Sequence, residues 1–194
     1  MWNDRYKVSE YIYGIEPNEF VKDNMQYIGN KVLLPADGEG RNSIFLAKKG
    51  KDVSSFDGSS VAVKKALLLA EQNKVSINAI VSMADEFNFD QNHYDTIILC
   101  YFHMSPELRI NIHQKCIKAL KIGGTIILEG FSKEQLEYKS GGPKDFDMLF
   151  SKEIITDDFK DLEKIKLSKE LVELNEGKYH QGPGSVIRFI GKKS

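Results

Sequence analysis

A glycine-rich turn between residues 36 and 40 constrains the fold of this chain more than any other feature of its sequence. The apolar run Val32–Leu34 precedes the turn, and a helix-like stretch from Arg41 to Lys49 follows it. Glycines let the backbone approach a ligand closely, and the N-terminus of a helix presents free N–H groups. Taken alone, the pattern also suits a tight turn that binds nothing. The order of strand, turn and helix nevertheless predicts the first unit of an α/β sheet.

The rest of the chain continues this alternation. Strands are predicted at 52–56, 76–82, 96–100 and 125–128, with helices from Ser59 to about Asn73 and from Pro106 to about Leu120. Residues 162–174 and 185–190 then form two strands joined by a polar turn. We therefore expect an α/β, Rossmann-like sandwich. Its mostly parallel seven-stranded sheet has an antiparallel last strand and helices on both faces.

Bulk properties exclude several classes of partner. The formal net charge of −1 gives no reason to expect a nucleic-acid or membrane-surface partner. The first residues have no apolar signal-peptide core, and no apolar run approaches ~20 residues, which predicts a cytoplasmic protein. Cys100 and Cys116 suit neither a disulfide framework nor a metal site. We expect a monomer or weak homodimer without a metal.

Acidic residues after the second and third strands indicate a nucleoside site. Asp57 ends the second strand, twenty positions after Asp37, where a carboxylate can accept both hydroxyls of a ribose. Beyond the third strand, the carboxylate of Asp85, beside Ala84, can accept from an adenine amine, and the N–H of Glu86 can reach a ring nitrogen. The alternatives are a helix cap at Asp57 and a solvated acidic loop after the third strand.

The spacing within the turn favours S-adenosylmethionine over a dinucleotide. The dinucleotide fingerprint needs Gly or Ala three positions after its second glycine, and Ser43 stands there. A nucleoside without phosphates does not need that residue. The closing antiparallel strands favour the same choice.

Several segments resemble the class I S-adenosylmethionine-dependent methyltransferases. Residues 32–42 are similar to the first motif of that class, and 94–97 and 120–124 to motifs shared widely across it. The Gly-Arg-Asn ending at 40–42 resembles the tellurite-resistance (TehB-like) and thiopurine-methyltransferase-like branch, as do residues 2–6, 13–18 and 141–145. The resemblance covers nearly the whole chain and implies one methyltransferase domain, 1–194. Its expected parts are an N-terminal lid or helical segment (1–30), a cofactor-binding core (31–131), and an acceptor-side loop with the closing strands (132–194).

Two positions depart from the class pattern. The class usually has an acidic residue at Leu34, where it helps to hold the amino group of the donor, and a glycine at Ala36. Asp37 is a candidate for the missing contact if the turn directs its side chain inward. The candidate donor-binding residues are Tyr13, Ala36, Asp37, Gly38, Gly40, Arg41, Asn42, Asp57, Gly58, Ser59, Ala84, Asp85, Glu86 and Cys100.

The acceptor is expected beside the fourth strand. Phe102 and His103 follow that strand, and His103 either deprotonates the acceptor or packs with its ring satisfied by backbone. His180 either reaches over the site or lies in solvent. The glycines near 139–144 suit a flap over the acceptor. The expected acceptor is a thiol, a metalloid oxyanion or a small heterocycle. The alternatives are a non-catalytic nucleoside-binding protein and an NAD-dependent oxidoreductase.

Overall fold

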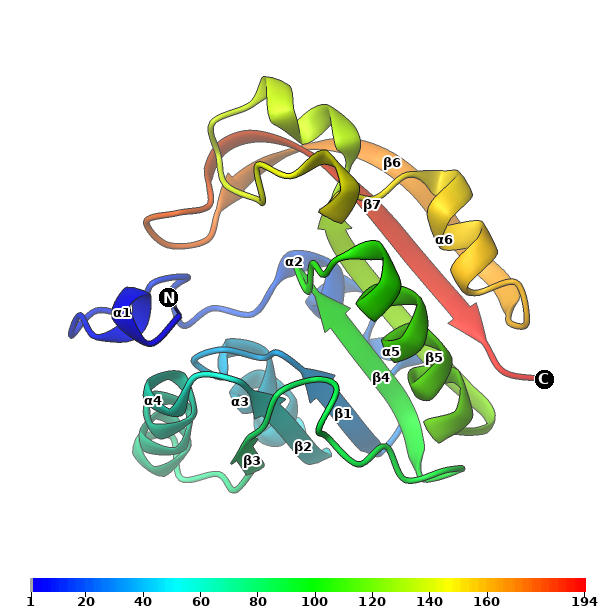
Figure 1. Cartoon of the computed structure of the whole chain (residues 1–194). Coiled ribbons are helices and arrows are strands. Elements are labelled where there is room, and N and C mark those ends of the chain that lie inside the picture. The colour runs from blue at the N-terminus through cyan, green and yellow to red at the C-terminus, as the bar shows by residue number, and fades with distance from the viewer. Residues whose placement is uncertain (1) are drawn as a thin grey trace.

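One seven-stranded sheet organises the computed structural model, which describes residues 2–194 (Figure 1). The strand order is β3-β2-β1-β4-β5-β7-β6. The first five strands run parallel, and β7 is antiparallel to both of its neighbours. This arrangement confirms the predicted fold class. The strands are β1 (Lys31–Pro35), β2 (Asp52–Asp57), β3 (Asn78–Val81), β4 (Tyr94–Cys100), β5 (Leu120–Phe131), β6 (Glu163–Asn175) and β7 (Gln181–Lys192).

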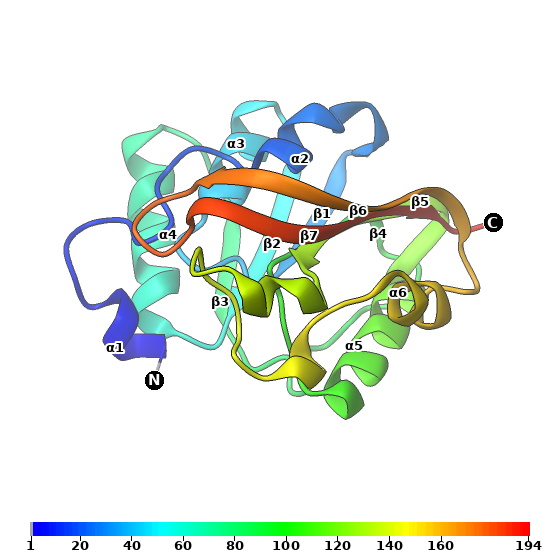
Figure 2. The ribbon, with the colours of Figure 1, turned by 90° about the horizontal axis from the view of Figure 1, so that it is seen from above.

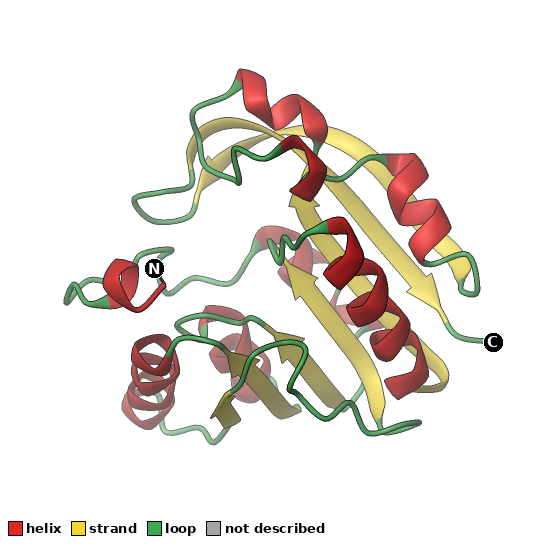
Figure 3. Ribbon diagram, viewed as in Figure 1, coloured by secondary structure: helices red, strands yellow, loops and turns green. Residues whose placement is uncertain are grey.

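Helices cover both faces of the sheet (Figures 2 and 3). Residues of α5 and α6 pack against one face, and residues of α2 and α3 pack against the other. Among the described residues, no helix is long and apolar enough to cross a membrane. The helices are α1 (Trp2–Tyr6), α2 (Glu19–Asp23), α3 (Arg41–Lys48), α4 (Ser60–Gln72), α5 (Pro106–Ala119) and α6 (Lys152–Asp158), with short 3-10 helices η1 (Met25–Tyr27), η2 (Lys133–Glu137) and η3 (Phe146–Met148).

The central strands are continuous apolar runs because both of their faces are buried. Side chains of a strand point alternately to opposite faces, so Leu33 and Ile97 join the core beneath α5 and α6. Val32 and Ile98, their chain neighbours, join the core beneath α2 and α3. Parallel strands covered on both faces have this composition, which is why the short run Val32–Leu34 was recognisable in the sequence.

Local signals mark the helix ends well and the sheet edge less well. Ser59 caps α4 by accepting a hydrogen bond from the N–H of Ala62, and Pro106 occupies the first turn of α5. The third strand is shorter than the predicted range 76–82, because it lies at the sheet edge and pairs only with β2.

The predicted flap is an ordered segment. Residues 132–150 contain η2 and η3, and an isolated bridge joins Ser132 to Phe150. The side-chain amide of Gln135 donates to Ser140 Oγ (3.0 Å) and to the Gly141 carbonyl (3.1 Å). These bonds hold the glycine-rich stretch close to the carboxyl edge of the sheet.

The sheet topology places a crevice beside β1. The chain builds β1, β2 and β3 toward one edge and then returns to place β4 on the other side of β1. Ligands of open α/β sheets bind at the carboxyl ends of the strands at such a switch point. The ends of β1, β2 and β4 therefore define the candidate site.

Candidate functional site

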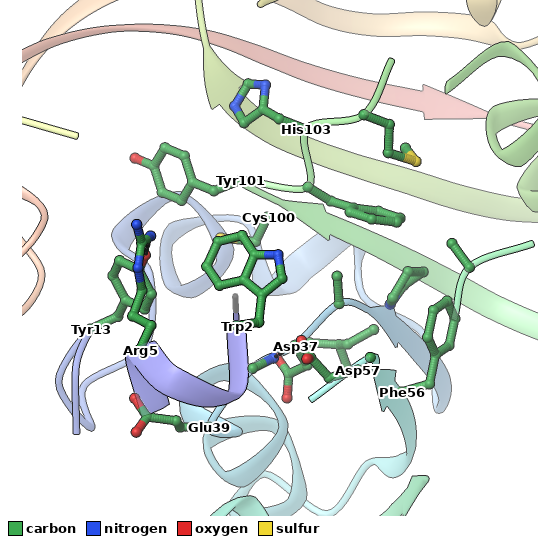
Figure 4. Close-up of a pocket in the computed structure, with 18 of the residues that line it drawn as sticks. Trp2, Arg5, Tyr13, Asp37, Glu39, Phe56, Asp57, Cys100, Tyr101 and His103 are labelled. Atoms are coloured by element: carbon green, nitrogen blue, oxygen red, sulfur yellow. Dashed lines mark hydrogen bonds between the residues drawn. The ribbon is translucent and has the colours of Figure 1, made fainter. Parts of the chain in front are cut away.

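A cavity of about 730 Å³ opens at this carboxyl edge (Figure 4). Its volume lies within the range of small-molecule sites. The ends of β1, β2 and β4 form its floor, and the N-terminal segment and the loop before α6 contribute walls. Fourteen of the predicted site residues line it: Tyr13, Ala36, Asp37, Gly38, Arg41, Asn42, Asp57, Gly58, Ala84, Asp85, Cys100, Phe102, His103 and His180.

The glycine turn has left-handed backbone at three positions. Gly38 (φ 57°) and Gly40 (φ 85°) adopt it without strain, whereas Ala36 (φ 52°) pays about 1 kcal/mol for its Cβ. Ala36 therefore holds a left-handed backbone that glycine would adopt at lower cost. Gly40 does not line the cavity, because a Cβ there would lie 2.7 Å from the Cβ of Ala66. Its role is the packing of α3 against α4.

Asp57 holds the turn in place and also faces the cavity. Its Oδ2 accepts the N–H of Gly38 (3.0 Å), and its Oδ1 accepts the N–H of Ser59 (2.8 Å). A carboxylate has about four acceptor sites, so two bonds leave capacity for ribose hydroxyls. The predicted cap role and the predicted ribose role are therefore compatible. Ser59 itself lies outside the cavity wall, where its hydroxyl donates to Asn3 Oδ1 (2.6 Å).

Leu34 and Asp37 form the part of the wall that departs from the class pattern. Leu34 is buried and apolar, so it cannot neutralise a cation. The Oδ2 of Asp37 is buried without a hydrogen-bond partner. Burial raises the pKa of Asp37 to about 7, and the charge of Asp57 acts in the same direction, while Ser43 and Arg41 oppose it. A carboxylate in these surroundings favours a cationic ligand.

Two of the three residues predicted to bind the donor in the loop after β3 line the cavity. Ala84 and Asp85 line the cavity. Glu86 does not, and its N–H donates to the Met83 carbonyl (3.2 Å) because residues 83–86 form a turn. The N–H that was expected to reach an adenine ring nitrogen is therefore already bonded, which corrects the prediction for Glu86.

A buried polar network that the sequence reasoning missed lies behind the cavity. The guanidinium of Arg41 donates to Glu176 Oε2 (3.1 Å), and Asn18 Nδ2 donates to Glu176 Oε1 (2.9 Å). His180 Nδ1 lies 3.1 Å from Glu176 Oε2. Although burial opposes ionisation, the hydrogen bond of His180 and the charge of Arg41 lower the pKa of Glu176 to about 2. The only sequence signal was an acidic residue in the turn before His180.

His180 lies over the cavity and not in solvent. Its ring packs against Tyr13 (centroids 4.7 Å apart), Tyr101 (4.6 Å) and Phe131 (5.2 Å). Tyr101 has left-handed backbone (φ 51°) and its hydroxyl donates to Glu129 Oε1 (2.9 Å). These rings give the acceptor side of the cavity a mainly aromatic wall.

His103 has no free ring nitrogen in this structure. Its Nε2 accepts the N–H of Phe131 (3.0 Å), so its Nδ1 carries the proton donated to the Met148 carbonyl (2.8 Å). Burial lowers the pKa of His103 to about 4. The geometry corresponds to the packed alternative and disfavours the predicted role of His103 as a base.

The N-terminal segment contributes one wall of the cavity. Trp2, Arg5 and Tyr13 line the same cavity as Asp37 of the glycine turn and Asp57 of β2 (Figure 4). We call residues 2–13 the strap. Ring contacts hold it together, since Trp2 stacks on Tyr6 with centroids 6.0 Å apart and the Arg5 guanidinium lies 4.8 Å from the Trp2 ring.

The residues present fit an S-adenosyl donor. Asp57 supplies acceptor capacity for a ribose, and the left-handed turn brings backbone close to the cavity. The partnerless oxygen of Asp37 suits the positive charge of a sulfonium or ammonium group. A Cβ on Gly38 would lie 2.9 Å from the Tyr6 hydroxyl, so the turn leaves no room for a side chain at that position.

Comparison with known proteins agrees with this geometry. A family model described as a methyltransferase domain matches residues 32–124. The tRNA (uracil(54)-C(5))-methyltransferase of Pyrococcus horikoshii is 32% identical over 126 residues, 59% of this chain and 29% of that protein. The chain spans about a third of the length of the curated relatives that it matches.

Two solved structures share the fold over the whole chain. One, described as converting a disulfide bond into a thioacetal group during echinomycin biosynthesis, has a TM-score of 0.80 at 14% identity and covers 99% of this chain and 88% of that one. The other, TehB from Haemophilus influenzae, has a TM-score of 0.73 at 18% identity and covers 100% of this chain and 66% of that one. At these identities, the likeness concerns the fold alone.

Proposed function

We propose that this protein, whose residues 32–124 match a family model described as a methyltransferase domain, transfers a methyl group from S-adenosylmethionine to a small-molecule acceptor. S-adenosylmethionine is the cofactor of this family, as predicted from the sequence. The division of the cavity into two unlike halves carries the proposal. The half at the strand ends is polar, and the half beside His180 is aromatic.

The donor occupies the polar half in this proposal. Asp57 accepts the ribose hydroxyls, and the backbone of the glycine turn lies along the methionine end. Asp37 replaces the missing acidic residue at position 34 and balances the positive charge of the donor. Ala84 and Asp85 lie where the adenine is expected. S-adenosylmethionine supplies a methyl group already activated by its sulfonium.

The acceptor half favours an uncharged molecule. Leu108, Phe102, Phe131 and Met148 line it. Of the charged residues that line the cavity, Arg5 lies on the strap, Arg41 is paired with Glu176, and the others are acidic. A metalloid oxyanion would find little cationic stabilisation there. This lining supports a thiol or a small heterocycle more than the oxyanion among the three expected acceptor types.

His180 is the group best placed to take a proton. Its Nδ1 is bonded to Glu176, so Nε2 is the ring atom left for an acceptor, and the low pKa of Glu176 keeps a carboxylate beside the imidazolium that forms. In the transfer, the acceptor's electron pair forms the new bond to the methyl carbon. The electrons of the S–CH₃ bond return to sulfur, giving S-adenosylhomocysteine, and the acceptor's proton moves to Nε2.

The names of the curated relatives raise tRNA methylation at a uracil carbon as a second candidate. That carbon is a weak nucleophile, and a protein thiolate that adds to the ring is one means of activating it. Burial raises the pKa of the Cys100 thiol well above its ordinary value, which disfavours the thiolate, and Cys116 lies in the core. The net charge of −1 also gives little attraction for a phosphate backbone. These observations favour the small acceptor.

Calorimetric titration tests the donor site. The protein is expected to bind S-adenosylmethionine and S-adenosylhomocysteine and not NAD. Asp57→Ala should weaken S-adenosylhomocysteine binding by more than tenfold, or about 1.4 kcal/mol. Asp52→Ala, at the opposite end of β2, is the matched control and should leave the affinity unchanged.

Two results would count against the proposal. Absence of binding by either sulfur nucleoside at millimolar concentration would remove the cofactor assignment. A screen of thiols, heterocycles, oxyanions and tRNA transcripts, read as released S-adenosylhomocysteine, tests the acceptor. Turnover confined to tRNA would replace the small acceptor with the second candidate.

A further inference from the structure

The ammonium group of Lys65 is surrounded by backbone oxygens of the strap. Its Nζ lies 2.7 Å from the Glu10 carbonyl, 3.0 Å from that of Val8 and 3.5 Å from that of Tyr6. The ring of Tyr11 adds a cation–π contact at 5.0 Å. Lys65 lies on α4, so one side chain ties a stretch of five strap residues, 6–10, to the body of the protein.

Glu39 completes the arrangement from the glycine turn. Its Oε1 lies 2.5 Å from Lys65 Nζ, and its Oε2 accepts the N–H of Ile12 (2.7 Å). The side chain of Lys65 is 14% exposed and that of Glu39 is 4% exposed, so the pair is largely withdrawn from water. Glu39 stands between Gly38 and Gly40 and connects the donor turn to the strap. Neither residue was predicted to act at the site.

The strap in turn forms part of the cavity wall. Trp2, Arg5, Tyr6 and Tyr13 all line the cavity. The Tyr6 hydroxyl lies 2.9 Å from where a Cβ on Gly38 would stand, so the strap touches the donor turn directly. Figures 1 and 2 agree in placing α1 beside α4, the helix that carries Lys65. A donor in the polar half would lie beneath these residues.

Removal of Lys65 would leave a buried carboxylate and several carbonyls without their common partner. The loss is costly for the Glu39 carboxylate, which is buried away from water, whereas the exposed carbonyls of Val8 and Glu10 can bond to water instead. The strap can recover those bonds by moving into solvent, where Trp2 and Val8 are already exposed, at the cost of exposing Tyr6 and Ile12, which pack against Ala62. The strap therefore gains an open state when the lysine is lost, while the sheet and its cores keep their contacts.

We propose that Lys65 and Glu39 are positioning residues that hold the strap closed over the donor, and that opening of this pair limits the exchange of donor and product. This inference rests on the proposed function, because it needs a sulfur nucleoside in the polar half of the cavity. It adds that residues outside the donor contacts set the rate at which S-adenosylhomocysteine leaves.

The single tryptophan of the chain reports on the strap. Trp2 is the sole tryptophan and belongs to the strap, so its fluorescence should change when S-adenosylhomocysteine binds. Stopped-flow displacement by excess S-adenosylmethionine then gives the dissociation rate. Lys65→Met removes the charge and keeps the apolar stem. Lys64→Met alters the neighbouring exposed lysine and is the matched control.

We expect Lys65→Met to raise the dissociation rate of S-adenosylhomocysteine at least tenfold and Lys64→Met to change it less than twofold. Glu39→Gln should raise it by a smaller factor, because the amide oxygen still accepts the Ile12 N–H. Lys65→Arg should restore a rate within threefold of the parent. Hydrogen exchange of residues 6–12 should accelerate in Lys65→Met while that of β4 and β5 does not.

The possible failures are distinguishable. If the parent protein binds neither sulfur nucleoside, the proposed function fails and this inference fails with it. If the parent binds but folded Lys65→Met releases S-adenosylhomocysteine at the parental rate, the clamp alone is refuted. Acceleration of exchange throughout the protein would assign Lys65 to general stability and also refute the clamp. If Lys65→Met does not fold, the rate measured for Glu39→Gln decides between the same outcomes.

Discussion

Replacement of Asp37 by asparagine tests the electrostatics of the donor turn. The pKa of Asp37 is raised to about 7 from an ordinary value of 3.8, mainly because the carboxyl is buried and partly because Asp57 is near. A raised folded-state pKa means that the folded protein holds a proton that the unfolded chain has released. The contribution of Asp37 to the free energy of unfolding is therefore largest below pH 3.8, and it falls as the pH rises to about 7.

The size of the effect follows from the shift. A difference of about 3 pH units corresponds to about 4 kcal/mol at 1.36 kcal/mol per unit. Asparagine has nearly the same shape as a protonated aspartic acid and does not titrate. Asp37→Asn should therefore match the parent near pH 4 and be more stable by up to about 4 kcal/mol at pH 8. For a chain of this length, that is about 10 °C in melting temperature.

Thermal and urea unfolding of both proteins from pH 4 to pH 8, without ligand, measures the difference. The gain should appear between pH 4 and pH 7 and then level off. The affinity for S-adenosylhomocysteine should change with pH in the opposite direction to the stability, because the ammonium group of the ligand stabilises the Asp37 carboxylate. Its affinity for the parent should rise from pH 6 to pH 8, and that for the variant should not. A stability difference that stays constant over this range would refute an abnormal pKa at Asp37.

Two further changes test the acceptor side and the core. His180→Gln should lower kcat for a neutral thiol by about 10²-fold at pH 7, and the loss should be smaller at a pH where the thiol ionises by itself. The affinity for S-adenosylhomocysteine should stay within threefold of the parent. A loss of kcat that is equal at every pH would argue against proton transfer to His180. Asp158→Ala should cost about 3 kcal/mol in urea unfolding, because Arg109 Nε (2.8 Å) and His113 Nδ1 (2.7 Å) share one buried oxygen of Asp158, whereas the exposed neighbour Asp157→Ala should cost little. Because the pKa of Asp158 is lowered, its stabilisation is present above about pH 4 and is lost as the pH falls further.

The sequence alone determined the strands, the main helix starts and the ligand edge. Those features depend on neighbours in the chain: an apolar run such as Val32–Leu34, a cap such as Ser59, and a proline such as Pro106. The glycine turn and Asp57 were recognisable because both follow strands directly. Parallel strands bring such positions to one edge of the sheet without further information.

Only the tertiary structure decided which side chains those positions meet. The ring of His103 is bonded to backbone 28 and 45 residues away, which disfavours the role of base predicted for it. His180 reaches the cavity, with Glu176 behind it, because both lie in the turn between β6 and β7, and β7 packs antiparallel beside β5. Lys65 meets Glu39 and the strap because α4 packs beside the turn.

These contacts depend on how whole elements pack, and they cannot be predicted from the periodicity of a single segment. A strand, a cap or a turn is set by forces between residues close in the chain, so its signal is local. The partner of a buried charge is set by the fold. A charge in apolar surroundings is stable only when it is paired, and the packing of the elements decides which groups lie close enough to pair with it.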